Sequence, residues 1–153
     1  MPDAPAPIDA DLAALADEFA FFSDWEERYS HIIDLGKSLP PLLEEAKTEA
    51  NRVRGCASQV WLVASATADQ PPRLQLAADS DAHIVRGLIA LVLRLYSGRT
   101  PTEIAAIDPD ALFHKLGLGE ALSAQRANGL RAMITRIRAL AAAAAADRPA
   151  PAG

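Results

Sequence analysis

The sequence has only one cysteine, Cys56, in its 153 residues. A single thiol cannot form a disulfide within the chain, and it cannot by itself hold a zinc ion or an iron–sulfur cluster. The three histidines, His31, His83 and His114, are not spaced as metal-ligand pairs, and no glycine-rich phosphate loop is present. We therefore expect a protein that binds no metal and carries no cofactor of its own.

A surplus of basic residues is also missing, since 15 Lys and Arg stand against 20 Asp and Glu and the net charge is −5. Attraction to phosphate backbones needs such a surplus, so nucleic acid is not an expected partner. The longest apolar stretch, residues 84–95, contains Arg86 and Arg94 and is shorter than the roughly 20 residues that cross a bilayer. The N-terminus shows no basic region followed by an apolar run, as a secretory signal would. These features predict a soluble, cytoplasmic protein that does not contact membranes.

The length is that of one ordinary domain, and half of the residues are hydrophobic, which is enough for one packed core. Both ends, residues 1–7 and 147–153, are rich in Pro and Ala and are predicted to be disordered tails. A single domain is expected between them, over residues 8–146.

Apolar residues at helical spacing predict several helices in this domain. Two N-terminal helices are expected to pair as a hairpin, the first capped by Asp9 and the second starting at a capping box of Ser23 and Glu26. A third helix, apolar around most of its circumference, follows residues 79–81 (Asp-Ser-Asp), which we interpret as its cap. A last helix is predicted after Ser123.

The pattern changes between the second and third helices, where β-branched and alternating residues predict strands at 59–65 and 73–77. Residues 51–54 are expected to add a third short strand. One of Val60 and Trp61 should then face the core. The fold class predicted is α+β, a small antiparallel sheet of about three strands packed against helices on one face.

The strongest local signal for chemistry is Gly55-Cys56 in the loop before the predicted strand at 59–65, with Arg52 and Arg54 close in sequence. A thiol reacts as its thiolate, and nearby cations lower its pKa, whereas an apolar pocket raises it. The two arginines predict the cationic setting. Glycine before the cysteine permits a backbone conformation that would present the sulfur at a loop tip. A small buried side chain without reactivity is the competing interpretation.

Three motifs occur together and in order. They are N-R-V-R-G-C-A-S-Q-V-W at residues 51–61, D-S-D at 79–81 leading into I-V-R-G-L-I-A at 84–90, and L-S at 122–123 followed by R-A-N-G-L at 126–130 and Met133. With these motifs the chain resembles the SufE family of sulfur-acceptor proteins, including its CsdE-like branch, over about residues 19–140. The resemblance implies a SufE/IscU-like fold.

The resemblance also implies a function. Cys56 would receive sulfur as a persulfide from a PLP-dependent cysteine desulfurase (SufS-like), stimulate that enzyme, and deliver the sulfur to an iron–sulfur scaffold (SufBCD-like). The PLP belongs to the desulfurase, so this chain needs no cofactor. A paralogous desulfurase (CsdA-like) that serves another sulfur pathway remains an alternative partner.

The resemblance further implies which residues support the thiolate or dock the partner. Besides Cys56 they are Arg52, Arg54, Gly55, Ser58, Gln59, Asp81, Arg126 and Asn128. Arg126 falls in the first turn of the last predicted helix, where a cation meets the helix dipole unfavourably. We expect Arg126 to lie near the Cys56 loop, Asp81 to shape the same surface, and Cys56 to be partly covered until the loop moves outward on docking.

Two functions of other classes stay open. A plain α+β interaction module with an incidental cysteine predicts that Cys56→Ser leaves function intact. A thiol hydrolase predicts turnover of an ester or amide without any partner, and it needs a histidine beside Cys56.

Overall fold

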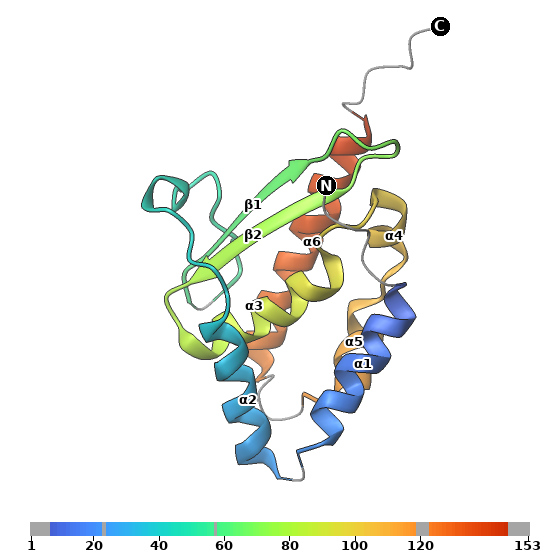
Figure 1. Cartoon of the computed structure of the whole chain (residues 1–153). Coiled ribbons are helices and arrows are strands. Elements are labelled where there is room, and N and C mark those ends of the chain that lie inside the picture. The colour runs from blue at the N-terminus through green and yellow to red at the C-terminus, as the bar shows by residue number, and fades with distance from the viewer. Residues whose placement is uncertain (1–6, 23, 57, 119–122, 147–153) are drawn as a thin grey trace, which may run out of the picture.

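The computed structural model describes residues 7–22, 24–56, 58–118 and 123–146, and its elements are shown in Figure 1. In chain order they are α1 (Ile8–Ala20), α2 (Trp25–Lys37), the short 3-10 helix η1 (Glu44–Ala46), β1 (Val60–Ala66), β2 (Leu74–Ser80), α3 (His83–Tyr96), α4 (Pro101–Ala106), α5 (Pro109–Leu116) and α6 (Ala124–Ala146).

The sheet is an antiparallel hairpin of β1 and β2 in which Val60 pairs with Ser80 and Ala66 with Leu74. The predicted third strand at 51–54 is wrong as a full strand. It is reduced to a bridge between Arg52 and Trp61, with hydrogen bonds from Val53 N to Val60 O and from Leu62 N to Asn51 O. Residues 51–53 pair with β1 only briefly, because the turn that carries Cys56 begins directly after them.

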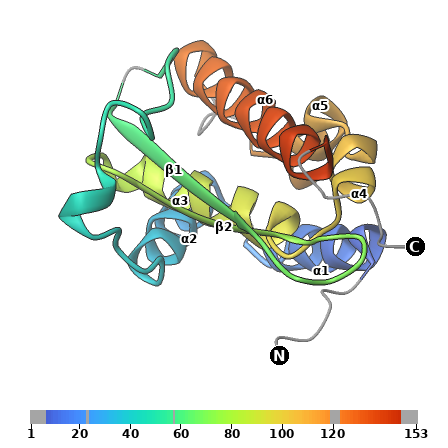
Figure 2. The ribbon, with the colours of Figure 1, turned by 90° about the horizontal axis from the view of Figure 1, so that it is seen from above.

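Helices cover one face of this hairpin, as predicted. Val60 and Leu62 of β1 and Leu74 and Ala78 of β2 are buried, and these residues lie on the same face of the paired strands. α3 packs against β2 and α6 packs against β1, and Figures 1 and 2 show both helices beside the hairpin. The sequence-based prediction of an α+β fold is therefore confirmed.

The opposite face of the sheet is covered in part by the chain that follows α2. Trp61 is half-buried there, with the Lys47 ammonium 5.5 Å from the centre of its ring. Of the two residues that follow the cysteine loop, Val60 thus faces the core. Trp61 faces away from the core, and its ring makes a cation–π contact with Lys47.

Local capping signals identify some helix starts and miss others. Thr100 and Glu103 form the capping box of α4, and Ser123 Oγ accepts a hydrogen bond from Arg126 N at the start of α6. The start of α2 differs from the prediction, because Asp24 is its N-cap and accepts from Glu27 N. Ser23 lies outside the described residues. Asp9 is not a cap either, since α1 already begins at Ile8.

The two N-terminal helices diverge from their connection instead of packing side by side as predicted (Figure 1). α2 lies along α3, whereas α1 packs on α5. Their adjacent ends are joined through His31, whose Nε2 lies 2.7 Å from Glu18 Oε1 and whose ring contacts Phe19 and Phe22.

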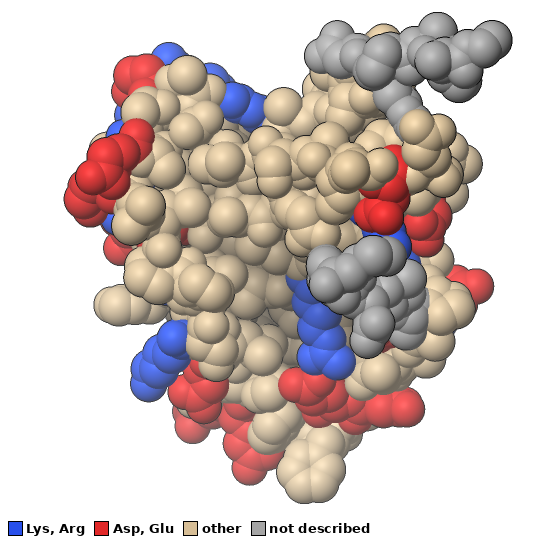
Figure 3. All heavy atoms as spheres, turned by 45° about the horizontal axis from the view of Figure 1, so that its top comes forward, with Lys and Arg blue, Asp and Glu red and all other residues tan. Residues whose placement is uncertain are grey.

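The face shown in Figure 3 has a wide uncharged area at its centre, and the basic side chains around it stand beside acidic ones. This face therefore carries no continuous basic patch. Among the described residues, no helix is long and apolar enough to cross a membrane.

Candidate functional site

Cys56 lies in the turn between the Arg52 bridge and β1, directly against the backbone of α6. Gly55 has a φ of 91°, a conformation that glycine adopts without strain. The Cys56 thiol donates a weak hydrogen bond to Gly129 O at 3.6 Å. A Cβ atom at position 129 would lie 3.2 Å from the sulfur. Because glycine has no side chain, position 129 lets the thiol pack directly against the backbone of α6.

Asp81 ties the end of the cysteine turn to the start of α3. Its Oδ1 accepts a hydrogen bond from Gln59 N at 3.1 Å, and its own N–H donates to Gln59 O at 3.3 Å. Asp81 is therefore not the helix cap that the sequence suggested. Ala82 is the N-cap of α3 and makes no side-chain capping bond.

A cavity of about 240 Å³ adjoins the thiol. Its walls combine Cys56 with apolar side chains of β1, α3 and α6, among them Val60, Leu88 and Met133. Polar residues also line it, namely Ser58, Ser123, Gln125 and Arg126. Because Ser123 and Gln125 are exposed, the cavity reaches the protein surface. The structure thus brings Arg126, a residue of the distant α6 motif, to the same cavity as Cys56.

Burial raises the pKa of the Cys56 thiol, and the nearby Arg52 lowers it only in part. The expectation of a lowered pKa is therefore wrong. Arg54, the second cation, is exposed and points to Glu49, with its Nη2 2.9 Å from Glu49 Oε2. The thiol is half-buried against α6 and the cavity, and this loss of solvation raises its pKa more than the single remaining cation, Arg52, lowers it.

This balance predicts the pH dependence of the thiol. A raised pKa means less thiolate at any pH below it, so alkylation of Cys56 by a small reagent should reach half its maximal rate at a higher pH in the folded chain than in the urea-unfolded chain. Arg52→Gln should shift this midpoint further upward. Arg54→Gln is the matched control and should leave it unchanged, and an equal shift in both variants would contradict this assignment.

Not every predicted site residue reaches the cavity. Asn128 is exposed, and its Oδ1 lies 3.5 Å from Arg131 Nη1 on the surface of α6. Arg54 lines a different, shallow groove with Val53 and Ala132. Ser58 lines the cavity, while Gly55 and Gln59 act through the backbone of the turn.

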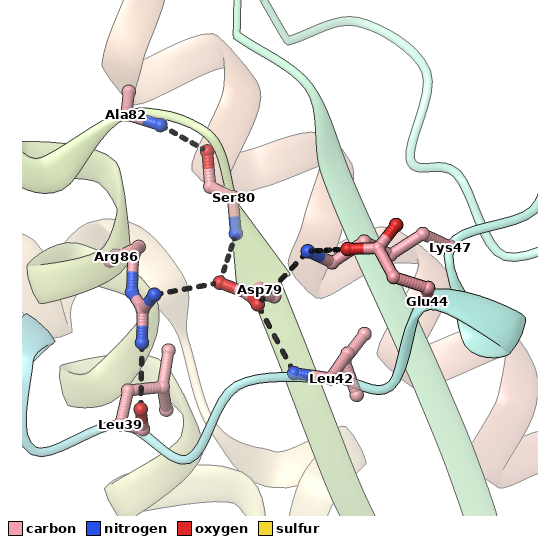
Figure 4. A network of polar contacts seen from close by, with 8 residues as sticks. All are labelled: Leu39, Leu42, Glu44, Lys47, Asp79, Ser80, Ala82 and Arg86. Atoms are coloured by element: carbon pink, nitrogen blue, oxygen red, sulfur yellow. Dashed lines mark hydrogen bonds and ion pairs between the residues drawn. The ribbon is translucent and has the colours of Figure 1, made fainter.

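The acid at the other end of the Asp-Ser-Asp motif, Asp79, has a structural role that the sequence did not reveal (Figure 4). It is buried, and its carboxylate accepts from Leu42 N at 3.1 Å and Ser80 N at 2.8 Å. Arg86 Nη1 lies 3.3 Å away and Lys47 Nζ 3.8 Å away. Asp79 thus joins the segment after α2 to the sheet and to α3, and it is not a helix cap.

The contact that Gly129 makes with Cys56 was not predicted from the motif that contains it. A glycine in a helix interior costs about 1 kcal/mol relative to alanine, so its presence in α6 was a usable signal of close packing. Its partner, Cys56, is 73 positions away in the chain and could not be identified from spacing.

The histidines do not support a thiol hydrolase. His31 is engaged with Glu18, His83 and His114 are exposed, and none of them lines the cavity beside Cys56. In the part of the chain that the structure describes, no three His, Cys, Asp or Glu side chains are grouped as metal ligands.

Comparisons with known proteins agree with the motifs. The chain is similar to an uncharacterised SufE-like protein of Rhizobium etli, with 52% identity over 139 residues, 90% of this chain and 94% of the relative. A second uncharacterised SufE-like protein, from Rhizobium meliloti, is 54% identical over 128 residues, covering 83% of this chain and 91% of the relative.

The fold has a counterpart among solved structures. The solution structure of a hypothetical protein from Thermus thermophilus superposes with a TM-score of 0.71 at 19% identity, covering 95% of this chain and all of that protein. A family model described as SufE, an Fe-S metabolism associated domain, matches residues 13–141. On the family match and the identity to its relatives, the chain belongs to the SufE family.

Proposed function

We propose that this chain is a sulfur acceptor and carrier. Cys56 takes persulfide sulfur from a PLP-dependent cysteine desulfurase of the SufS-like kind and delivers it to a SufBCD-like scaffold in the cytoplasm, where thiols are kept reduced. Membership of a family associated with Fe-S metabolism supports the pathway. The observation that carries the proposal is a half-buried thiol on a glycine turn beside a cavity that also holds Arg126.

The transfer is an exchange in which atoms and electrons balance. The Cys56 thiol loses a proton, and its thiolate attacks the outer sulfur of the persulfide on the desulfurase. A sulfur–sulfur bond forms at Cys56 while the one on the donor breaks, and the donor cysteine leaves as a thiolate. Removing the persulfide frees the donor for another turnover, which is how the acceptor stimulates the enzyme. The PLP of the desulfurase releases the sulfur from cysteine and is not needed on this chain.

The cavity gives the carrier a sheltered resting state. A thiolate or persulfide in open solvent is oxidised or reduced by small molecules that it meets. The raised pKa keeps the free Cys56 protonated, and the apolar walls beside it limit its contact with water. Transfer then requires the turn to move outward when the partner docks, with Arg126 and Asp81 near the exposed sulfur.

Mass spectrometry after incubation with a SufS-like desulfurase and cysteine tests the proposal. The chain should gain about 32 Da per sulfur atom, a reductant should remove the added mass, and Cys56→Ser should not gain it. Desulfurase turnover should rise with the wild-type chain and not with Cys56→Ser. An interaction module with an incidental cysteine predicts equal stimulation by both, and that outcome would sink the proposal.

The choice of partner is tested by the same assay with a CsdA-like desulfurase. Faster uptake of sulfur from the SufS-like enzyme supports the proposed pathway, and the reverse order assigns the chain to the other pathway.

The outward motion of the cysteine turn has its own test: in the free protein, a bulky thiol reagent should label Cys56 much more slowly than a small one. Equal labelling rates would contradict a covered resting state.

A further inference from the structure

One face of α6 lies against the segment that leads to Cys56. Gly129, Ala132 and Arg136 are spaced three and then four residues apart, so these positions form one row on the helix surface. Gly129 contacts Cys56, and Ala132 Cβ lies 3.4 Å from the point where a Cβ at Gly55 would be. Residues 50–56 therefore run along α6 in the opposite direction to the helix.

Arg136 holds the beginning of this segment. Its Nη1 donates to Arg52 O at 2.7 Å, and its Nη2 donates to Ala50 O. On the other side of the same segment, Val53 N donates to Val60 O and Leu62 N donates to Asn51 O. The stem of the turn is thus fixed from both sides, by α6 and by β1.

The described residues at the tip of the turn make fewer backbone hydrogen bonds than the stem. Among the described residues between Val53 and Gln59, no backbone group makes a hydrogen bond to another backbone group. At the tip, the Cys56 thiol makes a weak hydrogen bond to Gly129 O of α6. After the tip, Asp81 fixes the backbone of Gln59. The described residues of the tip therefore make fewer backbone hydrogen bonds than the stem before them and Gln59 after them.

We propose that Arg136 is a positioning residue for sulfur transfer. By holding the carbonyls of Ala50 and Arg52, it confines the outward motion to the tip and sets the path along which Cys56 reaches its partner. The inference rests on the proposed function for its consequence in transfer, although the restraint itself is a property of the free protein. Precise placement matters because a shift of about 1 Å in a reacting group can cost as much as a hundredfold in rate.

The test compares Arg136→Ala with Arg138→Ala. Arg138 is a matched control on the same helix, since its guanidinium also donates to two backbone carbonyls, those of Ala105 and Ile107, away from the cysteine turn. Two rates are measured on each variant: labelling of Cys56 by a small thiol reagent in the free chain, and single-turnover sulfur uptake from saturating desulfurase.

In Arg136→Ala, labelling should become about tenfold faster because the stem no longer limits opening, a change equivalent to about 1.4 kcal/mol. Uptake at saturation should fall about tenfold, while the desulfurase concentration at half-saturation stays unchanged, because docking is intact and the thiol is misplaced. Arg138→Ala should resemble the wild type in both rates. Arg136→Lys keeps a single donor nitrogen in place of two, so both of its rates should lie between those of the wild type and Arg136→Ala.

Equal rates in Arg136→Ala and Arg138→Ala would overturn the inference, as would a fall in both labelling and uptake. If Arg136→Ala fails to fold, Arg136→Lys and Arg136→Gln carry the same comparison at a temperature below their unfolding. Failure of the proposed function is distinguishable, because the wild type would then take up no sulfur while the difference in labelling between the two arginine variants persists.

Discussion

Replacing Gly87 with alanine is expected to lower the free energy of unfolding by at least about 3 kcal/mol, the upper part of the usual range for overpacked sites. A Cβ atom on Gly87 would lie 2.0 Å from Ile32 O and 2.6 Å from Ile32 C. These are backbone atoms of α2, so the clash is relieved only if α2 and α3 separate. The same contact appears from the other side, where a Cβ on Gly36 would lie 2.7 Å from Gly87 N.

Helix propensity works against this loss but is too small to cancel it. Alanine in the interior of α3 gains about 1 kcal/mol over glycine. Ile32 of α2, in contrast, packs against Gly87 and is fully buried, and Leu88 and Ile89, which follow Gly87 in α3, are almost inaccessible to solvent. Moving the helices apart opens space around these side chains and forfeits their packing.

Urea unfolding at equilibrium measures the effect, and Gly129→Ala is the matched control. A Cβ on Gly129 would meet the Cys56 sulfur at 3.2 Å, and the sulfur, at the end of its side chain, can shift by a few tenths of an ångström. We expect Gly129→Ala to change stability by less than about 1 kcal/mol. If Gly87→Ala were as mild, the close approach of α2 and α3 would be disproved.

The contrast between the two glycines shows what the sequence could predict. Both stand inside helices, where glycine is unfavourable, so each position signals a close contact. The identity of the contact depends on the fold, because Gly87 meets a residue 55 positions earlier and Gly129 meets Cys56, 73 positions earlier. Local patterns therefore indicate that a glycine is needed and leave open what approaches it.

Helix caps show the same limit. Thr100 with Glu103 and the Ser123 cap depend on residues three positions apart, and the helix start predicted after Ser123 is confirmed. Residues 79–81 have the composition of a cap, yet Asp79 binds Leu42 N and Asp81 binds Gln59 N across the fold. Acidic residues serve as helix caps and as acceptors for distant backbone N–H groups, and only the tertiary structure distinguishes the two.

At the candidate site, the sequence predicted a glycine turn that carries the thiol, but it did not predict the electrostatics around that thiol. The prediction of a lowered pKa counted Arg52 and Arg54 as neighbours of Cys56 because they are close in sequence. The structure turns Arg54 toward Glu49 and half-buries the thiol against α6. Desolvation by a distant helix cannot be seen in local sequence, and here it determines the direction of the shift.

Asp79→Asn is expected to destabilise the protein by about 3 kcal/mol, the low end of the cost of removing one partner from a buried ion pair. Asparagine has nearly the same shape, so the loss is electrostatic and leaves two cations facing a neutral side chain. The Asp79 side chain is 3% exposed, whereas Arg86 and Lys47 are 23% exposed, so water compensates the cations in part.

The neighbouring acid offers the control. Asp81 is exposed and bonds the backbone through one oxygen, so Asp81→Asn should cost less than about 1 kcal/mol because an amide oxygen can still accept from Gln59 N. Asp79→Asn should also speed proteolysis of the segment at residues 39–47, which Asp79 holds through Leu42 and Lys47. Equal unfolding midpoints for the two variants would mean that the motif acts as a local cap after all. A loss confined to Asp79→Asn would establish it as the bond between the covering segment, the sheet and α3.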